Sequence, residues 1–150
     1  MTYTGDGRLL DNGPTAANDR YVVEVGTIDL SQRTSKTFAL KGLPSVNFVV
    51  GIQVSSATGK SNDGPIADAD VLMEIRDESG SQVVGVAGPL RTWTWSGSLR
   101  GGPSFVYERG PPGSYFSPAA KSSYELRVTV RTPSSVATPA LVVLKSGGWK

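Results

Sequence analysis

Glycine and proline interrupt this sequence about every five residues, because 18 glycines and 10 prolines are spread over 150 positions. Both residues are unfavourable inside helices and mark turns between short elements. Long helices therefore have little room. The segments between the turns are short and apolar at alternate positions, which is the pattern of β-strands. The sequence predicts an all-β protein.

Eight segments carry the strand pattern. They cover residues 21–30, 36–43, 46–54, 71–77, 82–87, 91–95, 123–131 and 139–145. The clearest is SYELRVTVR at 123–131, where every second residue from Tyr124 to Val130 is apolar. Residues 66–79 could also be drawn as a short amphipathic helix, but the alternation from Val71 to Ile75 favours a strand.

Turn and bulge signals locate the breaks within this pattern. The buried positions of 21–30 change parity after Val25, so a β-bulge is expected at Gly26. Gly51 marks a second bulge or a close approach of backbones. DESGS between 71–77 and 82–87 predicts a hairpin with a type I turn and a glycine bulge.

A chain of 150 residues is the size of one domain and can bury an adequate core. About eight short strands with regular turns predict an antiparallel two-sheet β-sandwich of jelly-roll or C2-like type over residues 1–150. Leu9 and Leu10 are expected to add an edge strand or to plug the open end of the sheets. The long segments 55–68, 97–103 and 109–122 are the expected working loops, gathered at one end.

The side chains of common catalytic sites are missing, since the chain contains neither histidine nor cysteine. This excludes thiolate nucleophiles, disulfides and thiolate zinc sites, and it removes the commonest general base. No Gly-x-Ser-x-Gly elbow occurs, and the Ser-x-x-Lys pattern has no helix to carry it. We therefore expect a protein that is not an enzyme. A pair of carboxylates that meets only in the fold stays open as a hydrolase site.

The net charge of +2 is scattered along the chain. Arg91, Arg100 and Arg109 are the nearest approach to a basic patch, so no nucleic-acid partner is expected. No apolar run is long enough to span a membrane. The polar start MTYTGDG suits a mature domain whose export signal has been removed.

Calcium is the one cofactor that the sequence suggests. SNDGPIADAD places Asp63, Asp68 and Asp70 close together, and Ca²⁺ binds about six to eight oxygens. Asp and Asn also form turns by bonding their own backbone, and the spacing matches no calcium loop known to us. Calcium binding and turn formation both remain interpretations of this segment.

The aromatic pair in RTWTW has two interpretations. Trp93 and Trp95 would share one face of a strand, either in the core or as a platform for a sugar ring. The opposite face holds only Thr92 and Thr94, so we expect at least one of the two tryptophans in the core. The candidate binding residues are Trp93, Trp95, Tyr107, Tyr115, Phe116, Arg100 and Arg109.

Three hypotheses for function follow. The first is an interaction protein that engages a protein partner through loops or a sheet edge, including as an inhibitor or immunity factor. The second is a carbohydrate-binding module that uses Trp93, Trp95 and Tyr115. The third, a hydrolase with paired carboxylates, has the least support from the residues present.

The segments TGDGRLLDNG, RYVVEVGTIDLS and PALVVLKSGGWK carry a resemblance. With them the chain resembles small exported β-sandwich domains of uncharacterised Gram-negative proteins, some of them lipoproteins. The resemblance covers about a third of the chain. It implies a periplasmic or outer-membrane setting after loss of a signal, with an anchoring cysteine ahead of the domain, and it assigns no site residue.

Overall fold

The structure is a computed structural model, which describes residues 3–13, 20–55, 69–96, 104–108, 115–134 and 139–146. At positions 55, 94–96, 104–108 and 115 it describes the backbone only. This part of the chain forms eleven strands and one 3-10 turn, η1 (Leu90–Thr92). Within it, no helix is long and apolar enough to cross a membrane.

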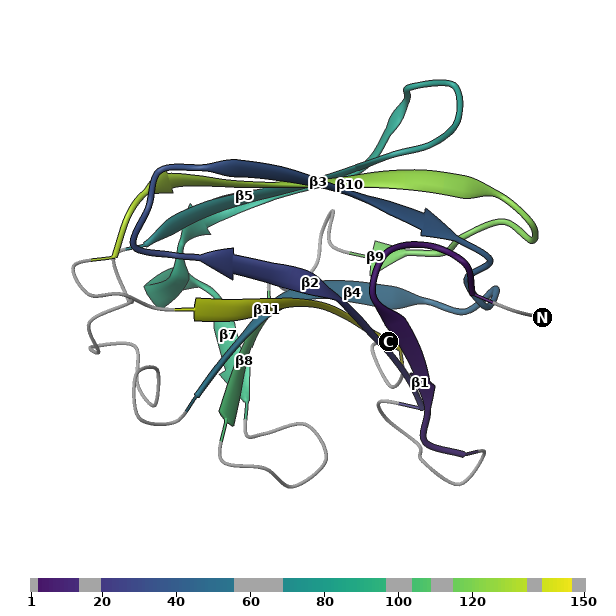
Figure 1. Cartoon of the computed structure of the whole chain (residues 1–150), viewed down its shortest axis with the longest axis horizontal. Helices are drawn as coiled ribbons and strands as arrows, with labels where there is room; N and C mark the ends of the chain where they lie inside the picture. Colours follow the sequence, from purple (N-terminus) through teal and green to yellow (C-terminus); the bar gives the residue numbers. More distant parts are fainter. Residues whose placement is uncertain are drawn as a thin grey trace.

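The strands form two antiparallel sheets stacked face to face (Figure 1). The larger sheet contains, in spatial order, β1 (Arg8–Asp11), β2 (Tyr21–Asp29), β11 (Pro139–Ser146), β4 (Phe48–Ser55), β8 (Ser104–Glu108) and β7 (Thr94–Ser96), and β9 (Tyr115–Phe116) also pairs with β4. The smaller sheet contains β3 (Ser35–Lys41), β10 (Ser123–Thr132), β5 (Asp70–Arg76) and β6 (Gln82–Pro89). The predicted all-β two-sheet sandwich is confirmed.

The strand order is that of a jelly roll. In the larger sheet β2 lies beside β11, followed by β4 and β8, and in the smaller sheet β3 lies beside β10, followed by β5 and β6. The chain crosses between the layers at every connection of these eight strands except the β5–β6 hairpin, which produces the double Greek key of this fold. The short strands β1, β7 and β9 are additions to the eight.

The core lies between the two sheets and is built from alternate residues of each strand. In β5 and β10 the fully buried side chains are Val71, Met73, Ile75, Leu126, Val128 and Val130. The residues between them point outwards and are polar in β10, as its sequence predicted. The strand assignment for β5, preferred over a helix, is also confirmed.

The predicted bulge at Gly26 is present. Gly26 pairs with Val142, but the next pair joins Glu24 and Val143, so Val25 is an extra residue in β2. The bulge lets Val25 and then Ile28 both face the core. At Gly51 no bulge forms, because β4 pairs with β11 without a shift in register.

The β5–β6 hairpin has the predicted turn. The amide of Gly80 donates to Asp77 O at 2.9 Å, the amide of Asp77 donates to Ser81 O at 2.9 Å, and Gly80 has a φ of 87°. A positive φ at this position is the mark of a type I turn followed by a glycine bulge. The pairing then shifts by one residue, which leaves Val83 as an extra residue near the start of β6.

The segment around the tryptophans differs from the prediction. Residues 91–95 were expected to form one strand, but Leu90–Thr92 form a 3-10 turn and β7 begins only at Thr94. The hydroxyl of Thr92 donates to Pro89 O at 2.7 Å, which closes this turn after β6. Trp93 therefore precedes the strand that holds Trp95, so strand parity does not relate the two side chains. Strands β8 and β9 were not foreseen.

The larger sheet is apolar on both faces at its centre. Val22 and Val143 are buried on the face turned away from the main core, and Leu10 and Leu141 pack against them. Neighbouring valines in β2 and β11 thus serve opposite faces, which accounts for the doublets at 22–23 and 142–143. Central strands covered on both sides lose the alternation typical of half-buried strands.

Candidate functional site

Two of the predicted binding residues belong to the core. Trp93 is 2% exposed, and its indole N–H donates to Gly88 O at 3.1 Å. Phe116 is 3% exposed and meets the ring of Tyr124 edge to face at a centroid distance of 4.7 Å. Neither ring offers a face to a sugar, so their assignment to a binding platform was wrong. The prediction that at least one tryptophan is in the core is confirmed for Trp93.

The other predicted binding residues are described in part or not at all. The backbone of Trp95 pairs with Tyr107 between β7 and β8, and Tyr115 pairs with Val49 between β9 and β4. The side chains of Trp95, Tyr107 and Tyr115, and all of Arg100 and Arg109, lie outside the described residues.

Of the three calcium candidates, the structure describes Asp70 alone. Arg131 is an extra residue in β10 at a register shift, and its Nε and Nη2 donate to Asp70 Oδ1 at 2.8 and 2.6 Å. This ion pair occupies the carboxylate that was expected to contribute to a calcium site. Asp63 and Asp68 lie outside the described residues, and within the described part no three acidic side chains are placed to hold a metal ion.

The expected working loops do not share one end of the sandwich. Ser55 pairs with Ser104 where β4 ends and β8 begins, so the segments 56–68 and 97–103 leave from that end. The segment 109–122 follows the opposite end of β8 and leads through β9, which pairs with the start of β4. The prediction of a single loop-bearing end was wrong, because strand order and direction decide where a connection emerges.

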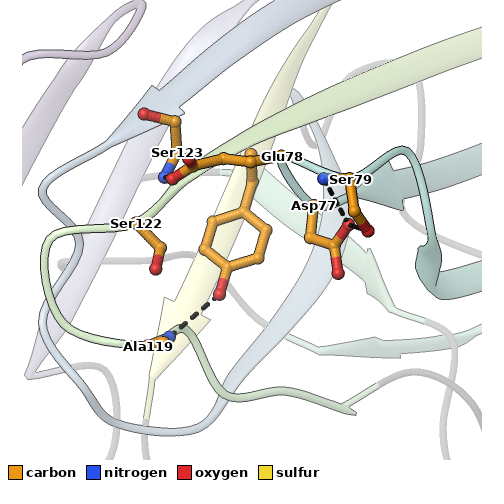
Figure 2. Close-up of a pocket in the computed structure, with 7 residues that line it drawn as sticks. Asp77, Glu78, Ser79, Ala119, Ser122 and Ser123 are labelled. Carbon is orange, nitrogen blue, oxygen red and sulfur yellow. Dashed lines mark hydrogen bonds between the residues drawn. The ribbon is translucent and has the colours of Figure 1, made fainter.

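A shallow pocket of about 330 Å³ lies between the β5–β6 turn and the start of β10 (Figure 2). Its lining residues are Asp77, Glu78, Ser79, Ala119, Ser122, Ser123 and Tyr124. In Figure 2 the turn residues Asp77 and Ser79 lie on one side of the pocket, and Ala119 and Ser122 lie on the other. None of the seven was a predicted site residue.

The carboxylates that line this pocket accept hydrogen bonds from neighbouring residues of the protein. Asp77 Oδ1 accepts from the amide and hydroxyl of Ser79 at 2.9 and 2.6 Å and from the amide of Ser81 at 3.0 Å. The hydroxyl of Ser79 is the largest cause of a pKa of Asp77 below its usual value. Glu78 accepts from the amide of Ser123 at 2.8 Å. The pocket therefore lies at a contact between the β5–β6 hairpin and the start of β10.

The sheet edges differ in how they are protected. The N-terminal strap, residues 3–7, lies along β3: the amide of Thr4 donates to Lys41 O at 2.9 Å, and that of Asp6 to Ala39 O at 2.7 Å. Asp6 Oδ2 accepts from the amide of Ala39 at 2.7 Å. The phenol of Tyr3 donates to Asp6 O at 2.6 Å, and burial raises the pKa of Tyr3 to about 12. The strap therefore covers the β3 edge at Ala39 and Lys41, and Figure 1 shows it passing on into β1.

Both edges of the larger sheet are short. The edge strand β1 has four residues, and Arg8 in it pairs with Glu24 of β2 at 2.6 Å. The other edge strand, β7, has three residues. Short strands, charges and covering segments are the devices by which natural sheets prevent pairing with a foreign strand.

Strand β6 has a bulge at Val83 and a proline at its end, but it is neither short nor charged, and no described segment covers it. It has eight residues, QVVGVAGP, with no charged side chain, and in the described part of the chain β5 is the only strand that pairs with it. Gln82, Val83 and Gly85 are exposed, with Val83 at 41%, while Val84 and Val86 point into the core. We name residues 82–88 the β6 edge. The missing charges were visible in the sequence, but the position of the strand at an edge was not.

Comparisons with known proteins add no family. No family model matches the chain, and no curated protein matches it. Among solved structures, the insecticidal delta-endotoxin Cry8Ea1 of Bacillus thuringiensis aligns with 79% of this chain and 19% of its own, at 14% identity and a TM-score of 0.40. The enzymatically active domain of tailspike protein 4 of bacteriophage CBA120 aligns with 95% of this chain and 17% of its own, at 15% identity and a TM-score of 0.33.

Proposed function

We propose that this chain is a non-catalytic binding module that engages a protein partner by β-strand addition at the β6 edge. The observation that carries the proposal is the contrast among the sheet edges. The strap covers the second half of the β3 edge, at Ala39 and Lys41, and β1 and β7 are short, but β6 combines length, exposure and the absence of charge. Such an edge is a template for an extended segment of another chain.

The partner segment would be extended and mostly uncharged. In an antiparallel pair, alternate residues of an edge strand direct their N–H and C=O groups away from the sheet, where a new strand can bond them. Each such hydrogen bond contributes about 0.5–1.5 kcal/mol net, so several are needed for a stable complex. On the outer face the exposed side chain of Val83 would accept small or β-branched residues, and the flexible end of Gln82, which lies over Gly85, would have to move aside.

The test uses a synthetic peptide of alternating threonine and valine and measures amide shifts and hydrogen exchange by NMR. We expect the amides of the β6 edge to shift and to become protected. A control peptide with an N-methyl group on every amide keeps every side chain but loses the donors of both its edges, and it should not bind. Unchanged β6 amides, or equal binding of both peptides, would contradict strand addition.

Two matched variants assign the binding to the edge. Val83→Lys adds a charge on the outer face of β6, and Thr37→Lys adds the same charge on the outer face of the strap-covered strand β3. We expect Val83→Lys to weaken peptide binding about tenfold, because edge lysines oppose strand pairing. Thr37→Lys should bind as the unmodified chain does. Equal loss in both variants would point to net charge rather than to the edge.

A further inference from the structure

The end of strand β1 holds a carboxylate against the peptide bond that follows an asparagine. Asn12 comes directly after β1 and is exposed, and Gly13 is the next residue. The amide of Gly13 donates to Asp11 Oδ1 at 2.9 Å. A glycine in this position has no side chain to keep its nitrogen away from the asparagine side chain. We propose that Asp11, Asn12 and Gly13 form a self-modification site, at which Asn12 is converted to isoaspartate and aspartate.

The reaction joins two atoms of adjacent residues. The amide nitrogen of Gly13 attacks Cγ of Asn12, and the new bond closes a cyclic imide through Cβ, Cα and the carbonyl carbon of Asn12. The proton of the amide passes to Asp11 Oδ1 and from there to Nδ2 of Asn12, which leaves as ammonia when the Cγ–Nδ2 bond breaks. Water then opens the imide. Its attack on the backbone carbonyl gives isoaspartate, and its attack on Cγ gives aspartate.

Asp11 has the position and the charge of a general base. Such a side chain lies within about 2.6–3.2 Å of the atom whose proton it removes, and the 2.9 Å between Asp11 Oδ1 and the nitrogen of Gly13 is in this range. The hydrogen bond from Gly13 and a second from Arg20, at 3.3 Å, lower the pKa of Asp11. The carboxylate is therefore ionised at neutral pH and able to accept a proton.

Gly13 has space in which the ring can close. Its φ is 96°, and a Cβ atom built on it would have no atom within 4 Å beyond those of the adjacent residues. The peptide between Asn12 and Gly13 can therefore rotate without displacing another part of the protein.

A second pair of residues in the described part of the chain could close the same ring but is held in place. Asp6 is also followed by a glycine, Gly7. Asp6 Oδ2 accepts from the amide of Ala39 at 2.7 Å, and a Cβ atom on Gly7 would overlap the carbonyl oxygen of Glu24. Because packing restrains both residues of this pair, modification is expected at Asn12 and not at Asp6.

Incubation of the purified chain at neutral pH and physiological temperature tests the site. We expect release of ammonia and formation of isoaspartate, detected by enzymatic methylation and located at residue 12 by tandem mass spectrometry. Asn12→Gln should remove both signals, because the longer side chain closes an imide ring far more slowly. Gly13→Ala should slow the reaction, since its methyl group obstructs the approach. Absence of isoaspartate at residue 12, or faster modification at Asp6, would overturn the proposed site.

Asp11→Ser tests the base. The hydroxyl of serine can still accept from the amide of Gly13, so the turn is kept while the ionised group is lost. We expect a reaction about tenfold slower, less than the roughly 10²–10⁴-fold of a tuned catalytic base, because Arg20 shares Asp11 Oδ1.

The pH profile separates a base from a residue that only shapes the turn. The rate of the unmodified chain should be constant from mildly acidic to neutral pH, where Asp11 is ionised and removes the proton. The rate of Asp11→Ser should rise in proportion to hydroxide over the same range. Proportionality to hydroxide in both proteins, or a faster reaction in Asp11→Ser, would overturn the assignment of Asp11.

Discussion

At the scale of single residues, Gly26 and Phe38 share one space. A Cβ atom on Gly26 would lie 2.5 Å from Cε1 of Phe38, closer than real atoms approach. Phe38 comes from the other sheet and covers the bulge at Gly26, so the missing side chain of one residue makes room for the ring of the other. The glycine that marked the bulge in the sequence therefore has a second role in packing the two sheets.

We predict that Gly26→Ala destabilises the protein by about 1–3 kcal/mol, the usual cost of overpacking. Urea denaturation of Gly26→Ala, Phe38→Leu and the double variant measures this. Because the smaller leucine frees the space that alanine needs, the double variant should lose less than the sum of the two single losses. Strict additivity would show that the ring does not oppose the new methyl group.

Asp77 makes a pH-dependent contribution to the free energy of unfolding. Its pKa is lowered from the model-compound value of 3.8 in the folded protein, chiefly by the hydroxyl of Ser79. A lowered folded-state pKa stabilises the fold above the unfolded-state pKa, and this stabilisation is lost as the pH falls through the folded value. The loss therefore belongs below about pH 4.

We expect Asp77→Asn to be less stable than the unmodified chain at neutral pH and to lose less stability on acidification. The measurement is the urea midpoint between neutral pH and strong acid. Asp11 also has a lowered pKa, through the amide of Gly13 and Arg20, so part of the acid dependence should remain in the variant. Parallel curves for the two proteins would contradict the role of Asp77.

At the scale of elements, the strap links the two sheets at one side of the sandwich. Its last residue, Gly7, has a φ of 74°, and a Cβ atom there would lie 1.9 Å from Glu24 O of β2. Lys36 of β3 also reaches across, since its Nζ donates to Thr27 O of β2 at 2.9 Å. This side of the molecule is thus closed by hydrogen bonds and by close backbone contact, in contrast to β6.

We predict that Gly7→Ala detaches the strap from β3. The matched control is Gly13→Ala, because Gly13 also has a positive φ, of 96°, but has no atom within 4 Å of the built Cβ. Native-state hydrogen exchange should show a faster amide of Ala39, which loses its acceptor Asp6, in Gly7→Ala and not in Gly13→Ala. Equally fast exchange of the Ala39 amide in the two variants would show that the strain of a positive φ is sufficient. The clash of the Cβ atom at position 7 with Glu24 O would then not decide whether the strap docks.

At the scale of the whole molecule, the jelly-roll order makes most strand pairs distant in the sequence. β2 near the N-terminus pairs with β11 near the C-terminus, and β10 pairs with both β3 and β5. Pairings of this kind require long loops to close before the contacts form, which slows folding. In the larger sheet the central pairs β2–β11, β11–β4 and β4–β8 all join strands that are not consecutive in the chain, so they cannot form as local hairpins.

We therefore predict refolding on a scale of about milliseconds to seconds, as for other all-β sandwiches. A chain with Trp95→Phe and Trp149→Phe keeps Trp93 as its single tryptophan. Since Trp93 is buried, its emission should shift to longer wavelength on unfolding, and stopped-flow dilution from urea follows its return. Refolding within microseconds would contradict the requirement for long-range pairing.

The sequence by itself determined the features that depend on neighbouring residues. The alternation of apolar residues predicted strands β5 and β10, and DESGS predicted the turn of the β5–β6 hairpin. The change of parity of the buried positions in β2 predicted the bulge at Gly26. Each follows from backbone geometry over a few residues. The prediction of one strand over residues 91–95 was wrong. The apolar pattern of this segment does not distinguish a 3-10 turn that buries Leu90 from a strand.

The tertiary structure alone decided which surfaces are open. That QVVGVAGP lies at an edge, that residues 3–7 cover β3, and that Trp93 and Phe116 are buried all depend on the order of strands within the sheets. That order results from packing between segments far apart in the chain, which no local pattern encodes. An uncharged strand becomes a site for another chain only if the fold leaves one of its sides without a neighbour.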